Sequence, residues 1–128
     1  MKKKYLIVIA DYYKDISNGL LSSAKDILPK SSSIKIINVP GVFEIPVTIS
    51  KNIKKYDAFL ALGCVIKGQT PHFDFISHSS TDAIMKLSID NKKPIGNGII
   101  TCLNMRQAKA RKKKGREAAK AVISVLSQ

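Results

Sequence analysis

The stretch AFLALGCVI, Ala58 to Ile66, is an unbroken apolar run that ends at Lys67. A strand with one face in water alternates apolar and polar residues, whereas a continuous apolar run suits a strand covered on both faces, as in a parallel sheet. The residues that follow, GQTPHFDF from Gly68 to Phe75, bring a glycine, a hydroxyl and an imidazole to the start of a predicted helix. A buried strand that leads into a polar turn and a helix predicts a parallel α/β sheet.

Further strands and helices are predicted around this run in strict alternation. The other strands are expected at Lys4–Ala10, Ile34–Val39 and Pro94–Thr101. The helices are expected at Ile16–Leu28, Phe43–Lys54, Phe73–Asp90 and Met105–Leu126, the last interrupted near Gly115. Ser17 is expected in the N-cap region of the first helix and Asn104 at the N-cap of the last. The pattern predicts an α/β fold with three α-β-α layers: a flavodoxin-like, four-stranded parallel sheet with helices on both faces, in a single domain over residues 1–128.

The composition limits the class of protein. The chain has 128 residues, 45% of them hydrophobic, which is enough for one ordinary core. No apolar run approaches the ~20 residues of a membrane-spanning helix. The apolar segment after Lys4 runs into Asp11 without a cleavage site, so we interpret it as a strand and expect a cytoplasmic protein. Cys64 and Cys102 lie in apolar segments without metal-ligand spacing, which favours buried free thiols and no metal.

The chain is strongly basic, with a formal net charge of +13 at pH 7. Such a charge is compatible with nucleic-acid binding. However, the lysines are spread along the chain, and only KARKKKGR, Lys109 to Arg116, forms a dense run. The sequence has neither an RNP-like aromatic pattern nor a helix-turn-helix pattern. A solvated, lysine-rich surface is therefore the preferred interpretation, with no nucleic-acid or membrane partner.

Polar and aromatic residues follow all four predicted strands, where ligands bind in sheets of this kind. The four segments are Asp11–Tyr13, Val39–Glu44, Lys67–His72 and Thr101–Asn104. Gly68, Gln69 and Thr70 offer N–H groups and a hydroxyl at a helix start, where phosphate is favoured.

Aromatic and titratable side chains complete this edge of the predicted sheet. Tyr12 or Phe43 could stack on a flat heterocycle. Glu44 could accept hydrogen bonds from ligand hydroxyls, and His72 could move protons near neutral pH. Arg111 or a nearby lysine could add a charge-assisted contact. Each of these residues also has a structural alternative, since Thr70 can cap a helix and Glu44 can favour a helix N-terminus.

Two motifs in this region resemble the lumazine synthase family. They are VPGVFEIP at residues 39–46 and LGCVIKGQTPHFDFI at residues 62–76, and the similarity extends from about Leu6 to Leu126. The resemblance implies the condensation of 5-amino-6-(D-ribitylamino)uracil with 3,4-dihydroxy-2-butanone 4-phosphate. The product would be 6,7-dimethyl-8-ribityllumazine, formed with release of phosphate and water in riboflavin biosynthesis. The family uses no metal and no organic cofactor, and it forms homopentamers or multiples of pentamers with active sites between neighbours.

The resemblance also implies roles for individual residues of this chain. Tyr12 matches an aromatic that stacks on the pyrimidine, and His72 matches the proton-transferring histidine. Val42, Phe43 and Glu44 match the segment that holds the pyrimidine and the ribityl chain. The remaining matches are the strand end that pairs with the uracil edge (Cys64, Val65, Ile66), the phosphate-binding residues (Gln69, Thr70, Arg111) and two supporting residues (Lys114, Glu117).

The sequence departs from the family pattern at two places. Asn97 stands where many members have an aromatic lent by a neighbouring subunit, which favours a hydrogen bond over stacking. The stretch between the family arginine and lysine is compressed to Arg-Lys-Lys-Lys at residues 111–114, so Lys112 or Lys113 remains an alternative to Arg111. The choice between a pentamer, a decamer and a sixty-subunit shell stays open.

Two other functions compete with the synthase. A basic RNA-binding module would use Lys109–Arg116, would bind in a salt-dependent way and would need neither Glu44 nor His72. A flavodoxin-like domain that only binds a flavin or its precursor would use Phe43 and Glu44 but would leave His72 beside a phosphate turn unexplained. Fold alone does not separate binding from catalysis.

Overall fold

The computed structural model describes residues 2–68 and 72–128. The strands are β1 (Lys4–Ala10), β2 (Ser33–Val39), β3 (Ala58–Ile66) and β4 (Ile95–Cys102). The helices are α1 (Lys14–Ile27), α2 (Ile45–Lys51), α3 (His72–Asn91), α4 (Met105–Ala110) and α5 (Gly115–Leu126), with a 3₁₀ turn, η1 (Val42–Glu44), before α2. In these described parts of the chain, no helix is long and apolar enough to span a membrane.

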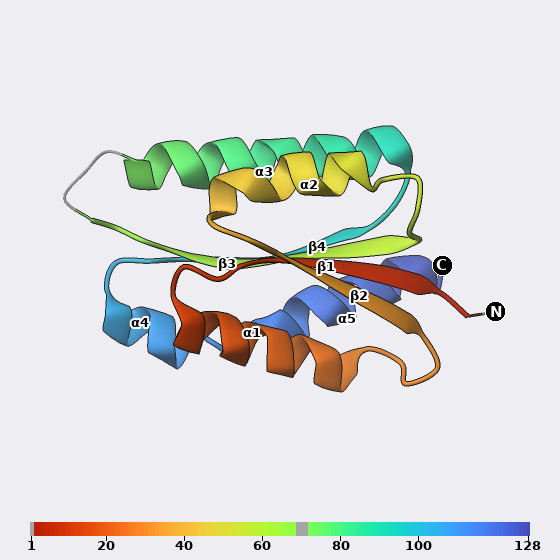
Figure 1. The fold of residues 1–128 in the computed structure, drawn as a ribbon, viewed down its shortest axis with the longest axis horizontal. Helices are drawn as coiled ribbons and strands as arrows, with labels where there is room; N and C mark the ends of the chain where they lie inside the picture. The colour runs from red at the N-terminus through yellow and green to blue at the C-terminus, as the bar shows by residue number, and fades with distance from the viewer. Residues whose placement is uncertain (1, 69–71) are drawn as a thin grey trace.

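The elements form three layers, which confirms the predicted α/β fold. Figure 1 shows the sheet in the middle, with α2 and α3 on one face and α1, α4 and α5 on the other. The four strands are all parallel and lie in the order β2-β1-β3-β4. Because parallel strands need crossover connections, each helix layer is a direct consequence of the strand pattern.

The strand order places a switch point between β1 and β3. The chain leaves β1 toward β2 on one side, and later returns to the other side of β1 with β3. The crossovers on the two sides therefore run over opposite faces of the sheet, and a crevice opens where they separate. In open α/β sheets this crevice, at the carboxyl ends of the strands, is the usual ligand site.

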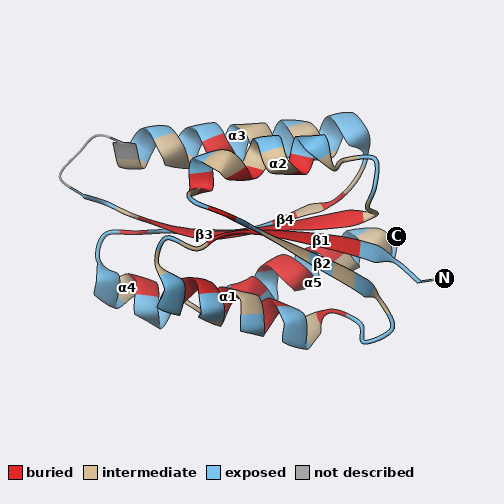
Figure 2. Cartoon of the chain, in the orientation of Figure 1, coloured by how far each residue is buried: buried red, intermediate tan, exposed pale blue. Residues whose placement is uncertain are grey.

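The core consists of two apolar layers separated by the sheet. The central strands are almost fully buried, as Figure 2 shows, and every residue of β3 except Ile66 is buried. Ile7, Ile9, Leu60 and Leu62 face the α1/α5 layer, where Ala118, Ala119 and Val122 pack against them. The second layer lies under α2 and α3 and contains Leu6, Val8, Ile45, Ile49, Phe59 and Ile84. The continuous apolar run predicted for β3 thus reflects coverage on both faces.

Of three local predictions about helix ends, two are wrong and one is confirmed. The predicted helix at Phe43–Lys54 is wrong at both ends, because a 3₁₀ turn comes first and α2 ends at Lys51. Ser17 is not an N-cap. It lies within α1, and its hydroxyl donates to the carbonyl oxygens of Ala10 (2.7 Å) and Tyr13 (3.0 Å). Asn104 does cap α4, because its Oδ1 accepts from the Gln107 N–H at 2.9 Å.

Candidate functional site

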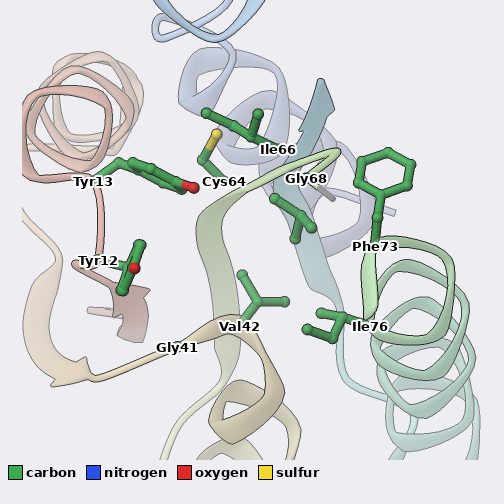
Figure 3. Close-up of a pocket in the computed structure, with 10 residues that line it drawn as sticks. Tyr12, Tyr13, Gly41, Val42, Cys64, Ile66, Gly68, Phe73 and Ile76 are labelled. Carbon is green, nitrogen blue, oxygen red and sulfur yellow. The ribbon is translucent and has the colours of Figure 1, made fainter. Parts of the chain in front are cut away.

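A cleft of about 590 Å³ lies at the switch point, at the carboxyl ends of β1 and β3. Residues of four segments line it: Tyr12 and Tyr13 after β1, Gly41 and Val42 after β2, Cys64, Val65, Ile66 and Gly68 at the end of β3, and Phe73 and Ile76 from α3. Figure 3 shows these side chains around the open space. Five of the predicted site residues come together here: Tyr12, Val42, Cys64, Val65 and Ile66.

The end of β3 presents backbone groups to this cleft. The pairing of β1 with β3 runs from Tyr5↔Ala58 to Ile9↔Leu62, whereas β3 stays paired with β4 as far as Ile66↔Cys102. The segment from Gly63 to Ile66 therefore has a strand partner on the β4 side and faces the cleft on the β1 side. Backbone N–H and C=O groups in such a position need hydrogen-bonding partners from solvent or from a ligand. A planar ligand with its own donors and acceptors can pair with this strand end.

Gly63 allows the turn after β2 to close over β3. A Cβ atom at Gly63 would lie 2.9 Å from Val42 Cγ2 and 3.2 Å from the Ala10 Cβ. Val42 is itself buried in the layer under α2 and α3. Because Gly63 has no side chain, Val42 can pack closely against β3. This packing places Val42, and with it Gly41, along one side of the cleft.

Two consecutive tyrosines form another side of the cleft. Their ring centroids are 4.9 Å apart with an interplanar angle of 85°, an edge-to-face arrangement that aromatic pairs prefer. Tyr12 is 75% exposed, so one face of its ring is free for a flat ligand. Tyr13 is half-buried and packs against the core cluster under α1 and α5.

The two cysteines are buried free thiols, as predicted. Burial, with a smaller contribution from Cys102 nearby, raises the pKa of the Cys64 thiol to about 12. A thiol with this pKa is protonated at neutral pH and is a poor nucleophile. Across residues 2–68 and 72–128, no three His, Cys, Asp or Glu side chains gather as ligands for a metal ion.

Three predicted site residues lie outside the cleft of the single chain. Phe43 is 66% exposed and lines a separate depression between α2 and α3, together with Val47. The Glu44 carboxylate lies close to Gly41, since a Cβ atom on that glycine would be 3.1 Å from Glu44 Oε1. Asn97 lies on the exposed side of β4, where its Oδ1 accepts from the Ile99 N–H at 3.0 Å.

A second, basic depression contains the predicted residues of the α4–α5 segment. Arg111, Lys114 and Glu117 line it, with Lys113 and Arg116 beside them. Arg111 Nη1 donates to the carbonyl oxygen of Thr101 at 3.2 Å, which fixes the guanidinium at the carboxyl end of β4. Lys114 pairs with Glu117 at 2.9 Å. The structure thus divides the predicted residues between an apolar cleft and a cationic depression.

The remaining predicted residues belong to the turn before α3. Gln69 and Thr70 lie outside the described residues. His72 is the first residue of α3, and its side chain is likewise outside the description. Its backbone position places it one residue before the cleft-lining Phe73.

Five cleft residues were not among the predicted site residues: Tyr13, Gly41, Gly68, Phe73 and Ile76. Tyr13, Gly41 and Gly68 lie in segments predicted to converge at this edge. Phe73 and Ile76 lie in the first turns of α3, and their apolar spacing indicated packing alone. Their position directly after the polar turn is the signal that could have assigned them to the site.

The strand order and the cleft define the class of this protein: a doubly wound α/β protein with a cleft at the switch point of its sheet, where proteins of this class bind small molecules. A family model described as 6,7-dimethyl-8-ribityllumazine synthase matches residues 2–128. The chain belongs to this family.

Curated relatives bearing that name support the assignment over most of their length. The 6,7-dimethyl-8-ribityllumazine synthase of Bartonella bacilliformis is 42% identical, covering 95% of this chain and 87% of that protein. The enzyme of Agrobacterium fabrum is 39% identical and covers 98% and 95%, respectively. The protein named 6,7-dimethyl-8-ribityllumazine synthase 1 of Rhodopseudomonas palustris is 40% identical and covers 96% and 83%.

Proposed function

We propose that this chain condenses 5-amino-6-(D-ribitylamino)uracil with 3,4-dihydroxy-2-butanone 4-phosphate to 6,7-dimethyl-8-ribityllumazine, with release of phosphate and water. The observation that carries the proposal is the family match over residues 2–128. The cleft supports it, because the part of the site assigned by resemblance to the flat pyrimidine is gathered in one place. The reaction would be the penultimate step of riboflavin biosynthesis and would use neither metal nor organic cofactor.

The proposed pyrimidine site uses both walls of the cleft. Tyr12 stacks on the ring with its exposed face, and Val42 contacts the ring from the side of β2. The backbone of Cys64, Val65 and Ile66 pairs with the uracil edge, for which the strand end without a β1 partner is suited. Phe43 and Glu44 hold the ribityl chain, whose hydroxyls donate hydrogen bonds to the Glu44 carboxylate.

The proposed chemistry consists of proton transfers and loss of phosphate. Imine formation and phosphate elimination both need a proton donor or acceptor that titrates near neutral pH, the role assigned to His72. Gln69, Thr70 and Arg111 form the phosphate cradle, and Lys114 and Glu117 support it. Positioning of the two substrates supplies the rest of the rate enhancement.

We further propose that the active site is composite and that the chain, a single domain over residues 1–128, forms pentamers or multiples of them. In the single chain, Asn97 lies on β4 and Arg111 borders a separate depression, so neither lines the cleft. A neighbouring copy supplies them in the proposed assembly. Large apolar side chains on α2 and α3 remain exposed, among them Val47, Phe75, Met85 and Ile89. An apolar surface on these helices would suit contact with a neighbouring copy.

The decisive experiment is a two-substrate assay in which lumazine absorbance and fluorescence are followed. Product is expected only when both substrates are present, with single-substrate reactions as controls. Tight binding of the pyrimidine without product would favour the ligand-binding alternative. Failure to bind either substrate, together with salt-dependent RNA binding, would favour the basic module.

The assembly and the location are tested separately. Light scattering after gel filtration should give a particle of five 14.1-kDa chains or a multiple of five. A monomer with full activity would contradict the composite site. Cell fractionation should place the protein in the cytoplasm, the location that the proposed function implies.

A further inference from the structure

Tyr13 is the inward-pointing polar side chain of an otherwise apolar cleft. Among the described lining residues, only Tyr12, Tyr13 and Cys64 carry a polar side-chain group. Tyr12 is largely exposed to solvent. Figure 3 shows the Tyr13 hydroxyl directed toward Cys64 on the inner side of the cleft. A ligand that enters the cleft therefore meets the Tyr13 hydroxyl at the end of β3.

The surrounding structure holds this side chain in place before a ligand arrives. The Tyr13 carbonyl oxygen accepts from the Ser17 N–H at 2.9 Å and from the Ser17 hydroxyl at 3.0 Å. The Ser17 hydroxyl also donates to the carbonyl oxygen of Ala10, so the segment between β1 and α1 is held at both ends. The Tyr13 ring packs against the core and is in edge-to-face contact with the ring of Tyr12. A side chain held in this way loses little entropy when it makes a new hydrogen bond.

Among the described residues, the neighbours of the Tyr13 hydroxyl leave its hydrogen-bonding capacity available. The thiol of Cys64 is a weak donor and a weak acceptor. Burial raises the pKa of Tyr13 above its ordinary value, with smaller contributions from Tyr12 and Cys64, so the phenol keeps its proton at neutral pH. A neutral phenol can both donate and accept, which suits the edge of a heterocycle that carries both kinds of group.

We propose that Tyr13 is a specificity-determining residue for the pyrimidine substrate: its hydroxyl hydrogen-bonds a polar edge atom of the ring while Tyr12 stacks on the ring face. The proposal rests on the proposed function and adds a residue to the same site. The two tyrosines then have different roles: Tyr12 supplies a ring face for stacking, and Tyr13 supplies a directed hydrogen-bonding group. It also predicts discrimination between substrates, because the phosphate substrate makes no contact with Tyr13.

The test is Tyr13→Phe in the full chain, with Tyr56→Phe as the matched control, because Tyr56 lies beside Phe59 and does not line the cleft. Each variant removes one hydroxyl and keeps the ring. Tyr13→Phe should weaken binding of 5-amino-6-(D-ribitylamino)uracil about 5- to 10-fold, the value of one neutral hydrogen bond. The KM of the phosphate substrate should not change, and kcat should fall less than about twofold, because the lost contact is made equally in ground and transition states. Tyr56→Phe should bind the pyrimidine as the wild type does.

A second measurement does not depend on any variant at Tyr13. In protein labelled with ¹³C at tyrosine Cζ, the resonance of Tyr13 should move on titration with the pyrimidine substrate. Equal binding by Tyr13→Phe and wild type, or a Tyr13 resonance that does not move while the pyrimidine binds, would overturn the proposal. Wild-type turnover alongside either result would leave the proposed function intact, whereas a wild type that neither binds nor reacts would end both.

Discussion

The guanidinium of Arg111 is anchored to the carboxyl end of β4, because its Nη1 donates to the Thr101 carbonyl oxygen at 3.2 Å. This contact holds although only Arg111–Lys114 separate α4 from α5. The neighbouring lysines are engaged differently: Lys112 pairs with Asp15 at 3.5 Å and Lys114 with Glu117 at 2.9 Å. Within the described residues, no carboxylate pairs with Arg111, which favours it as the anion-binding member of the run.

Replacement of Arg111 by alanine should raise the KM of the phosphate substrate about 10- to 100-fold, since a hydrogen bond to a charged group contributes about 1.5–3 kcal/mol. The KM of the pyrimidine should stay within about twofold. Steady-state kinetics with each substrate varied in turn measures both values.

Lys112→Ala is the matched control for Arg111, because its partner is the exposed carboxylate of Asp15. This variant should leave both KM values unchanged. If Lys112→Ala or Lys113→Ala raised the KM of the phosphate substrate and Arg111→Ala did not, the phosphate role would belong to that lysine.

Loss of the imidazole at residue 72 should slow the reaction without abolishing it. We expect His72→Ala to lower kcat by about 10²-fold or more, the usual contribution of general acid–base catalysis, while substrate positioning preserves a rate above background. His78→Ala, at an exposed position of α3, is the control and should keep the wild-type rate. Single-turnover kinetics gives the chemical step directly. Equal rates for both variants would remove His72 from the mechanism.

Gly115 lets α5 begin directly against α1, and this close approach should be visible in stability. A Cβ atom at this position would overlap the backbone carbonyl of Leu20, which cannot swing aside as a flexible side chain can. Gly115→Ala should therefore lower the free energy of unfolding by about 2–3 kcal/mol, as overpacking typically does. Gly68→Ala is the control, because no atom of the described residues lies within 4 Å of its added Cβ. Urea midpoints that are equal for the two variants would contradict the close contact.

The raised pKa of Cys64 predicts slow alkylation. With a pKa of about 12, only about one thiol in 10⁴ is ionised at pH 8, so iodoacetamide should modify native Cys64 far more slowly than the unfolded chain. The native rate should rise about tenfold per pH unit between pH 8 and 11. Mass spectrometry of Cys64 peptides follows the reaction, with Cys102→Ala to isolate the site. A rate that levels off near pH 9 would show an ordinary thiol.

The same pKa shift also sets the sign of the effect on stability. The native thiol holds its proton at pH values where the unfolded thiol has already lost it, so folding is favoured less as the pH rises from about 9 toward 12. Unfolding of Cys64→Ala should therefore depend less steeply on pH in this window than unfolding of the wild type. Urea titrations at pH 8, 9 and 10 compare the two slopes.

The strands could be predicted closely because their signal is local. The β1 and β3 spans agree with the apolar runs residue for residue, since a strand covered on both faces tolerates polar residues only at its ends. Asn104 is predictable for the same reason, because a cap needs only its own side chain and an N–H three residues on. The hydroxyl of Ser17 instead finds carbonyls at the end of β1, a contact that depends on how α1 packs.

The site was predictable as a set of segments and less so as a set of side-chain directions. The carboxyl-end rule brings Tyr12, Val42 and the end of β3 together from strand order alone. Phe43 follows Val42 directly, but the 3₁₀ turn directs its side chain into a separate depression. The α-helix predicted to begin at Phe43 does not predict this orientation of the side chain. Tyr13 was missed as a site residue because nothing in the sequence tells which of two adjacent tyrosines faces inward.

The central position of β1 governs how the chain is built during translation. This strand is synthesised before both of its neighbours, which start at Ser33 and Ala58, and β3 pairs in turn with β4, which starts at Ile95. Neighbouring strands are joined through helices and not through tight turns. No β-hairpin can therefore form early and bury the apolar strands as they leave the ribosome. Closure over such distances is slow and exposes strand edges meanwhile. Until about residue 102 has emerged, the nascent chain can form only an incomplete sheet with exposed apolar strands. Such a chain is prone to aggregation and can benefit from chaperones.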